Sequence, residues 1–257
     1  MTDPSGLDPQ AAALIARQFG VAFEQVRRDH LISLTLAALK PLSHQLVFFG
    51  GTALARSYLP QGRMSEDIDL IAAGPRSDVA DALVRAVNRG LRPTHGIPQW
   101  SRPLTEVREV DPVTISTDDG SSVRIQLLSL VGYPPWPTAP TRVRQRYDDA
   151  PPVTLLMPTR AAFAAWKTVA WIDRHAARDL WDLWAMAGVG AIDAEAGRLF
   201  VEHGPTLAPP KSWMFTTAPT AEQWREQLAS QTILTVTAEQ ALTAVRAAWA
   251  AAAGAED

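Results

Sequence analysis

Two aspartates spaced two residues apart are the side chains of this chain best suited to hold a metal ion. Asp67 and Asp69 belong to the segment Ser65-Glu66-Asp67-Ile68-Asp69-Leu70. Alternate residues of a strand point to one face, so a strand here would present both carboxylates and Ser65 together. Carboxylate oxygens suit Mg²⁺. We predict Asp67 and Asp69 as Mg²⁺ ligands and catalytic residues; the structural alternative is a solvated strand end or a helix cap.

A glycine turn lies a short distance upstream of the two aspartates. The apolar residues around Phe48 predict a strand over 46–49, and Gly50-Gly51-Thr52 follows it directly. Glycines at a strand end allow backbone N–H groups to approach a phosphate closely. We predict that Gly50, Gly51 and Thr52 bind a nucleotide, together with Ser65, whose alternative role is that of a turn or cap hydroxyl. A phosphate-binding turn and metal-binding carboxylates together indicate nucleotidyl transfer.

A second polar cluster lies in the helical segment 166–184. Lys167 has mostly apolar neighbours, so it needs an anionic partner or a bound phosphate, unless its side chain extends to the surface. On one continuous helix it would lie about four turns from Asp182, and we predict a helical break near 174–177 that returns it toward Asp182. Asp179 and Asp182 as purely structural partners are the alternative. We predict Lys167 and Asp182 as catalytic residues and Arg178 as a nucleotide contact.

The elements that must position these residues change type along the chain. Residues 8–40 are predicted to be helical, 67–72 a strand, and the segment from Pro75 a helix. The alternating segment 104–131 contains the hairpin turn Asp118-Asp119-Gly120. Six prolines make 132–152 a predicted loop or linker, and from residue 159 the pattern is helical. This order predicts a mixed α/β domain over 1–150 and a helical domain over 151–257.

Composition excludes several other classes of protein. The 257 residues include no cysteine, which excludes a disulfide scaffold, a thiolate nucleophile and a thiolate zinc site. The five histidines contain no i, i+4 metal pair. The start, MTDPSGLDPQ, lacks the basic and apolar regions of a signal peptide, and the apolar segments are too short to cross a bilayer. The lack of cysteine is compatible with a reducing cytoplasm, and we expect no membrane contact.

The residues above resemble the signature of the nucleotidyltransferase-like toxins of the AbiEii family, including its MenT branch. The resemblance rests on GGTALARSYLPQGRMSEDIDL, the downstream Lys167, and the block Arg178-Asp179-Leu180-Trp181-Asp182-Leu183. It implies a nucleotidyltransferase-fold core with a mixed sheet, flanking helices and a helical C-terminal part that completes the active site. It also implies the toxin of a bacterial toxin–antitoxin pair, with a cognate antitoxin as partner.

In the MenT branch, the resemblance implies transfer of nucleotides from an NTP to the 3′ acceptor end of tRNA, which blocks translation. Other branches are tied to phage abortive infection. An RNA acceptor needs a cationic surface. Arg142, Arg144 and Arg146 alternate in an extended stretch, so we expect them to point the same way, and they are the first candidates. Arg85, Arg89 and Arg92 come second, and solvated surface arginines are the alternative.

One position departs from the usual pattern of nucleotidyltransferases. A third carboxylate is expected on a later strand, but Gln126 stands in the middle of the corresponding segment, 122–130. Either the third metal ligand is absent or Asp182 supplies it.

Two other functions therefore stay open. The chain could transfer a nucleotide to a protein or small-molecule hydroxyl, or it could be a degenerate module that binds nucleotide without catalysis.

Overall fold

The computed structural model describes residues 6–254, which fall into two units. The first unit comprises residues up to 133 and 139–157, and the second comprises 134–138 and the residues from 158 onward. The predicted absence of a signal peptide rests partly on residues 1–5, which lie outside the described residues. Each unit carries a separate part of the predicted site.

A seven-stranded mixed sheet forms the centre of the first unit, in the order β3-β4-β5-β2-β1-β7-β6. β1 is antiparallel to β2 and parallel to β7, whereas β2 is parallel to β5 and β5 is antiparallel to β4. The strands are β1 (Leu46–Phe49), β2 (Asp67–Ala72), β3 (Gln99–Trp100), β4 (Val113–Ser116), β5 (Ser122–Ser129), β6 (Thr138–Arg142) and β7 (Thr154–Pro158).

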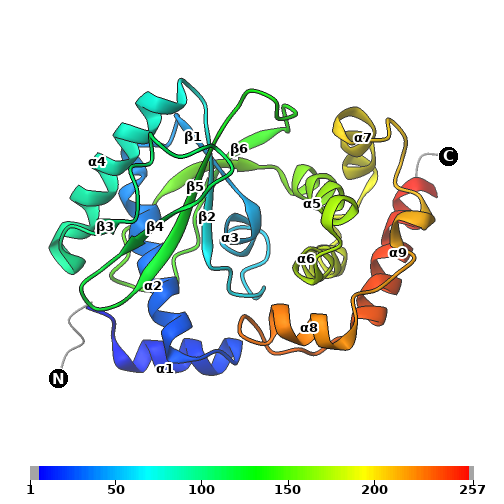
Figure 1. The fold of residues 1–257 in the computed structure, drawn as a ribbon. Helices are drawn as coiled ribbons and strands as arrows, with labels where there is room; N and C mark the ends of the chain where they lie inside the picture. Colours follow the sequence, from blue (N-terminus) through cyan, green and yellow to red (C-terminus); the bar gives the residue numbers. More distant parts are fainter. Residues whose placement is uncertain (1–5, 255–257) are drawn as a thin grey trace. The chain divides into compact units, whose positions relative to one another are not determined.

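Helices cover both faces of this sheet. Figure 1 shows α4 and α3 on opposite sides of it, and α2 packs against both α4 and β5. α3 contacts β1 and β2, the two strands that it joins. The helical segments of this unit are α1 (Pro9–Phe19), α2 (Phe23–Ala38), the short 3₁₀ helix η1 (Lys40–Leu42), α3 (Gly50–Ala55) and α4 (Arg76–His95).

The predicted helical region 8–40 is two helices rather than one. Asp8 caps α1 by accepting hydrogen bonds from the backbone of Gln10 and Ala11, and Gly20 ends it with φ of 67°. A left-handed glycine at this position terminates a helix because it breaks the repeating backbone geometry without strain. The chain then turns before Phe23, where α2 begins.

The prediction of an irregular linker over 132–152 is wrong in part. Residues Thr138–Arg142 form β6, the edge strand beside β7, which is itself a strand that the sequence analysis did not identify. Pro140 lies within β6, which is possible because an edge strand leaves one row of N–H groups unpaired. Pairing with a neighbouring strand outweighed local propensity here.

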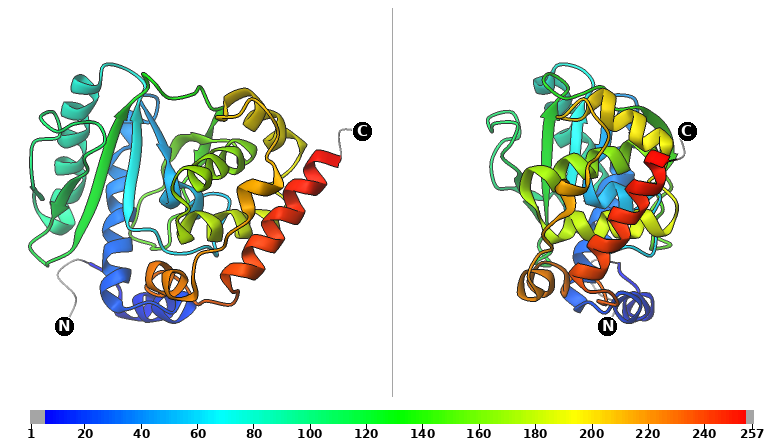
Figure 2. Two further views of the ribbon diagram at one scale, coloured as in Figure 1. Left: turned by 45° about the vertical axis from the view of Figure 1, so that its right-hand side comes forward. Right: turned by 90° about the vertical axis from the view of Figure 1, so that its right-hand side faces the viewer.

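The second unit is helical, as predicted. Thr159 caps α5 by accepting from the backbone of Ala162, and Trp136 stacks on Trp166 of α5 at 5.8 Å between ring centroids. α9, the long red helix of Figure 2, packs against α6 and α7. The helical segments are α5 (Arg160–Arg174), α6 (Ala177–Gly188), α7 (Ala194–His203), the 3₁₀ helix η2 (Ser212–Phe215), α8 (Ala221–Leu228) and α9 (Ala238–Gly254). Within residues 6–254, no helix has the length and apolar character needed to cross a membrane.

Candidate active site

The two aspartates lie on β2, with the alternation that the sequence predicts. Ile68 and Leu70 are fully buried, whereas Asp67 and Asp69 are half-buried on the other face. The apolar pair anchors the strand in the core, which fixes the direction of the two carboxylates. Ser65 precedes the strand and is buried.

The glycine turn lies directly against the Asp69 carboxylate. β1 pairs with β2 so that Phe49 is opposite Asp69, and Gly50 follows Phe49 with φ of 76°. A Cβ at Gly50 would collide with Oδ2 of Asp69. Only glycine fits this position, because a side chain would need both a strained backbone and the space of the carboxylate.

Gly51 and Thr52 lie in the first turn of α3, Gly51 beside the segment before β2 and Thr52 beside the first residue of β2. A Cβ at Gly51 would lie 2.6 Å from Nη2 of Arg63 and 2.9 Å from Oγ of Ser65. Thr52 is buried, and its hydroxyl donates to the backbone carbonyl of Asp67. This hydroxyl therefore joins α3 to β2, a connecting role that the sequence did not reveal.

Arg63 is a residue of this region that the sequence analysis missed. Its side chain is buried beside Gly51, next to Ser65. Arginines are rarely fully buried unless they are paired. The sequence did hold a sign of this role, because Arg63 continues the alternation of Ser65, Asp67 and Asp69 at every second residue.

The neighbouring strand β5 carries no acid at the two positions beside the aspartates. The register places Arg124 next to Asp67 and Gln126 next to Asp69. Arg124 donates to both carboxylate oxygens of Asp67, and these hydrogen bonds, with the charge of Asp67, raise the pKa of Arg124. Gln126 donates its amide to the backbone carbonyl of Val110 at 2.8 Å. Within residues 6–254, no group of three or more acidic, histidine or cysteine side chains could hold a metal.

Two carboxylates can still suit Mg²⁺. This ion keeps several waters and is commonly held by one or two carboxylates together with substrate phosphates, rather than by a complete protein cage. Asp67 and Asp69 supply the two carboxylates on one face of β2, and Gly50 lies beside Asp69. The donor set therefore fits a metal that arrives with a nucleotide.

In the second unit, the predicted helical break is confirmed. α5 ends at Arg174, His175 adopts φ of 49°, and α6 begins at Ala177. The break brings Nζ of Lys167 to 2.7 Å from Oδ2 of Asp182 and 3.1 Å from Oδ1 of Asp179. The side chain of Lys167 is only 9% exposed, so it is not an extended surface lysine.

Asp179 is the most strongly held carboxylate of this cluster. Arg174 donates to both of its oxygens, at 2.6 Å and 2.9 Å, while Lys167 donates to one. Burial raises the pKa of Asp179, but the charge of Lys167 and the hydrogen bonds from Arg174 outweigh it and hold that pKa well below its usual range. Asp182 pairs with Lys167 through Oδ2, and Arg178 is half-buried in the first turn of α6.

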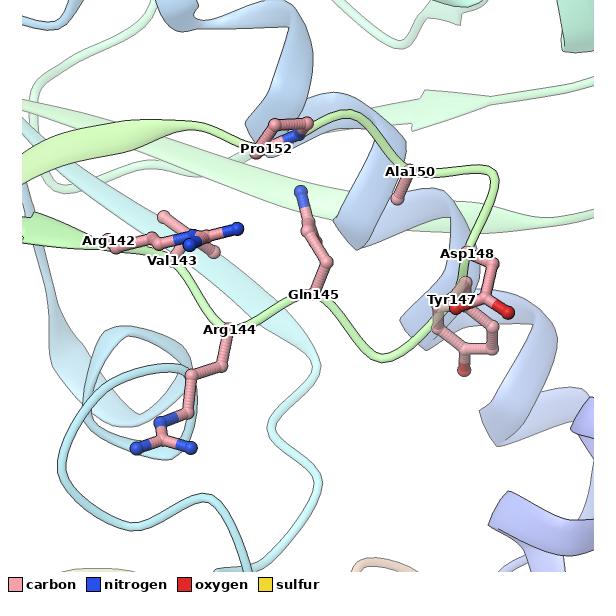
Figure 3. Close-up of a pocket in the computed structure, with 8 residues that line it drawn as sticks. All are labelled: Arg142, Val143, Arg144, Gln145, Tyr147, Asp148, Ala150 and Pro152. Carbon is pink, nitrogen blue, oxygen red and sulfur yellow. The ribbon is translucent and has the colours of Figure 1, made fainter.

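The three candidate arginines of the RNA surface do not share one environment. Arg142 and Arg144 are exposed and line a pocket of about 570 Å³ (Figure 3). Figure 3 also shows Arg144 and Gln145 extending to opposite sides of the segment. Arg146, by contrast, is 11% exposed and donates to the buried Asp29 at 2.7 Å. The expectation that all three point the same way is wrong, because the third pairs with an acid in the core.

Asp29 is the centre of a buried network that fixes this segment to the rest of the first unit. It accepts hydrogen bonds from Arg56 at 2.8 Å, Arg146 at 2.7 Å and the hydroxyl of Tyr147 at 3.0 Å. Burial alone raises the pKa of Asp29, but the charges of Arg146 and Arg56 hold it below its usual value. Arg56 directly follows α3, so the network also fixes the helix that begins at the glycine turn.

The structure has the fold of a nucleotidyltransferase toxin. It is similar to the structure of MenT4, nucleotidyltransferase toxin Rv2826c from Mycobacterium tuberculosis H37Rv, with a TM-score of 0.69 and 21% sequence identity. The match covers 94% of this chain and 89% of MenT4. At this identity the likeness establishes the fold, and it confirms the predicted α/β core with a helical C-terminal part.

The sequence assigns the chain to a family within that fold. Residues 34–254 match the family described as Nucleotidyl transferase AbiEii toxin, Type IV TA system. The chain therefore belongs to the AbiEii family of nucleotidyltransferase toxins, and the resemblance identified from the sequence is confirmed. A search of curated proteins finds no match.

Proposed function

We propose that this protein is a Mg²⁺-dependent toxin that transfers nucleotides from an NTP to the 3′ acceptor end of tRNA and so blocks translation. One observation carries the proposal: the Gly50 turn lies against the carboxylate of Asp69. A turn that fits phosphate and a carboxylate that fits a metal therefore occupy one place. Family membership supports the type of reaction, and the MenT resemblance supports the tRNA acceptor.

The residues of the first unit would bind and orient the nucleotide. The backbone of Gly50 and Gly51 holds the triphosphate, Ser65 contacts a phosphate, and Thr52 fixes the turn on β2. Asp67 and Asp69 hold Mg²⁺, which when bound neutralises the charge that develops on the phosphates. One of the two carboxylates also accepts the proton of the attacking 3′ hydroxyl.

The residues of the second unit would act on the leaving group. Lys167 and Arg178 stabilise the departing pyrophosphate, as positioned cations do in phosphoryl transfer. Asp182, at 2.7 Å from Nζ of Lys167, orients that lysine. Asp179 holds the same lysine but is also neutralised by Arg174, which supports a structural role for it.

The acceptor RNA would approach along Arg142 and Arg144. Both are exposed at an open pocket, whereas Arg146 serves the core. Phosphate contacts by such arginines position RNA without reading its sequence. Arg85 and Arg89 of α4 are also exposed and provide a matched pair for a control. A cognate antitoxin and a cytoplasmic location complete the proposal.

The test is label transfer from each α-³²P-NTP in turn, with Mg²⁺, total bacterial RNA and lysate protein. We expect label in a tRNA-sized band and its loss in Asp67→Asn. The matched control is Asp111→Asn, which removes another aspartate held by two hydrogen bonds from an arginine, Arg108. Label in protein or in a small molecule would replace tRNA as the acceptor, and label retained in Asp67→Asn would refute the metal assignment.

A degenerate nucleotide-binding module is the second candidate, and one observation favours it. The two positions of β5 beside the aspartates are Arg124 and Gln126, so the strand supplies no third carboxylate. Such a module would bind Mg²⁺ and NTP without turnover. Nucleotide binding by calorimetry, without label transfer to any acceptor, would identify it.

A further inference from the structure

The proposed metal ligand Asp67 already has a cationic partner. Nε of Arg124 lies 2.7 Å from Oδ1 of Asp67 and Nη2 lies 2.9 Å from Oδ2, so the guanidinium engages both carboxylate oxygens. The pairing follows from the sheet register, which makes these residues direct neighbours on β2 and β5. A divalent ion on Asp67 would therefore compete with Arg124 for the same oxygens.

This ion pair is exchangeable. The side chains of Arg124 and Asp67 are 52% and 27% exposed, and half-exposed pairs contribute little stability because water screens them. A divalent ion has twice the charge and gains a second carboxylate from Asp69. It also brings the phosphates of a bound nucleotide.

A cavity beside the pair gives the displaced guanidinium a place to act. About 340 Å³ of space is lined by Arg124 and Asp67 together with Arg28, Glu66, Thr114, Ser122 and Val123. Arg28 is held there by Gln25, whose Oε1 accepts from it at 2.9 Å, and by Glu66, whose Oε2 lies 3.7 Å from Nη1 of Arg28. A guanidinium that turns into this cavity joins a second cation and presents parallel N–H donors, which suit phosphate oxygens.

We propose that Arg124 is a replaceable counter-ion of the metal site. It neutralises and orients Asp67 before the metal binds, leaves the carboxylate when a divalent ion binds with the nucleotide, and then donates to a phosphate of the substrate. The inference rests on the proposed function, because it takes Asp67 as a metal ligand. It adds a substrate-contacting residue on β5, the strand that supplies no third carboxylate.

The first test measures metal binding without catalysis. Free Mn²⁺ is counted by electron paramagnetic resonance in titrations of the full chain, with and without an NTP. We expect Arg124→Gln to bind Mn²⁺ about two- to tenfold more tightly, because the variant lacks both the competing guanidinium and its positive charge. The Mn²⁺ affinity of Arg124→Lys should lie between those of the parent and Arg124→Gln, since an ammonium cannot engage both carboxylate oxygens as a guanidinium does. Arg108→Gln removes the same charge from an exposed Arg–Asp pair and should leave Mn²⁺ affinity unchanged.

The second test measures transfer, to locate the phosphate. Arg124→Gln should lose at least tenfold in kcat/KM despite its tighter metal binding, with partial recovery in Arg124→Lys. A raised KM for the NTP assigns the contact to the triphosphate, and a raised KM for RNA assigns it to the RNA backbone. Both results support the proposal.

Two results would overturn the inference, and they are distinguishable from failure of the proposed function. Unchanged or weaker Mn²⁺ binding in Arg124→Gln would show that the arginine does not compete for the carboxylate. Full transfer activity in that variant would show that it contacts no substrate phosphate. If Asp67→Asn instead bound Mn²⁺ as well as the parent, the metal site itself would be wrong.

Discussion

Replacement of Gly50 by alanine tests whether the glycine turn and the Asp69 carboxylate form one site. Gly50 has φ of 76°, where an L residue costs about 1–2 kcal/mol. The new Cβ would also overlap Oδ2 of Asp69. Gly120→Ala is the matched control, because Gly120 has φ of 81° but nothing within 4 Å of the added atom. The difference between the two variants isolates the collision from the backbone strain.

The expected magnitudes follow from this comparison. Gly120→Ala should lower the free energy of unfolding by about 1 kcal/mol, or the melting temperature by roughly 2–4 °C, and should leave transfer activity unchanged. Gly50→Ala should show the same loss of unfolding free energy. In addition, it should move the Asp69 carboxylate by about 1 Å, which costs about 100-fold in the rate of transfer.

The assay is label transfer at saturating NTP, together with thermal unfolding of each variant. Activity of Gly50→Ala within about twofold of the parent would refute the reasoning. Equal loss of activity in the two variants would also refute it, because backbone strain alone would then account for the effect.

Three further predictions concern the charged groups. Asp29→Asn should lower the free energy of unfolding by about 3–5 kcal/mol at pH 7 in urea titrations, since it leaves two arginines without their buried anion. The folded pKa of Asp29 lies below its unfolded value of 3.8, so its stabilisation is complete above that value and is lost as pH falls through the folded pKa. The difference between variant and parent should therefore begin to shrink as pH falls below 3.8 and should disappear only below the folded pKa, and a constant difference would contradict the assignment. Lys167→Met should abolish transfer and cost about 3–5 kcal/mol in the same titrations, because it removes the cation that the buried Asp179 and Asp182 share, and full activity would exclude a role for the lysine. Joint charge reversal of Arg142 and Arg144 should weaken tRNA binding about tenfold or more in filter assays and reduce its salt dependence, while NTP binding is unchanged. Charge reversal of Arg85 and Arg89 on α4 should weaken tRNA binding less. Equal weakening by the two double variants would mean that neither surface binds tRNA specifically.

Local patterns were sufficient to predict several elements of this protein. The strands Leu46–Phe49 and Asp67–Ala72 have the bounds predicted from an apolar run ended by glycine and from alternating acids. The hairpin turn around Gly120 is confirmed, with Gly120 donating to the carbonyl of Thr117. The break after Arg174 is also confirmed. Each of these features depends on backbone preferences and side-chain periods over a few neighbouring residues.

Features that depend on a distant partner could not be read from the sequence. Alternation predicts which face a side chain occupies but not which residue lies beside it, so the Arg124 partner of Asp67 became visible only with the sheet register. For the same reason Arg146 was grouped with the exposed arginines, although Asp29, 117 residues away, holds it in the core. β6 and β7 were missed because they pair at the end of the sheet rather than through local propensity. The sequence thus determined the elements and the chemical groups they carry. The tertiary structure decided which charges meet, because the energy of an ion pair depends on distance and burial, which only the packed chain defines.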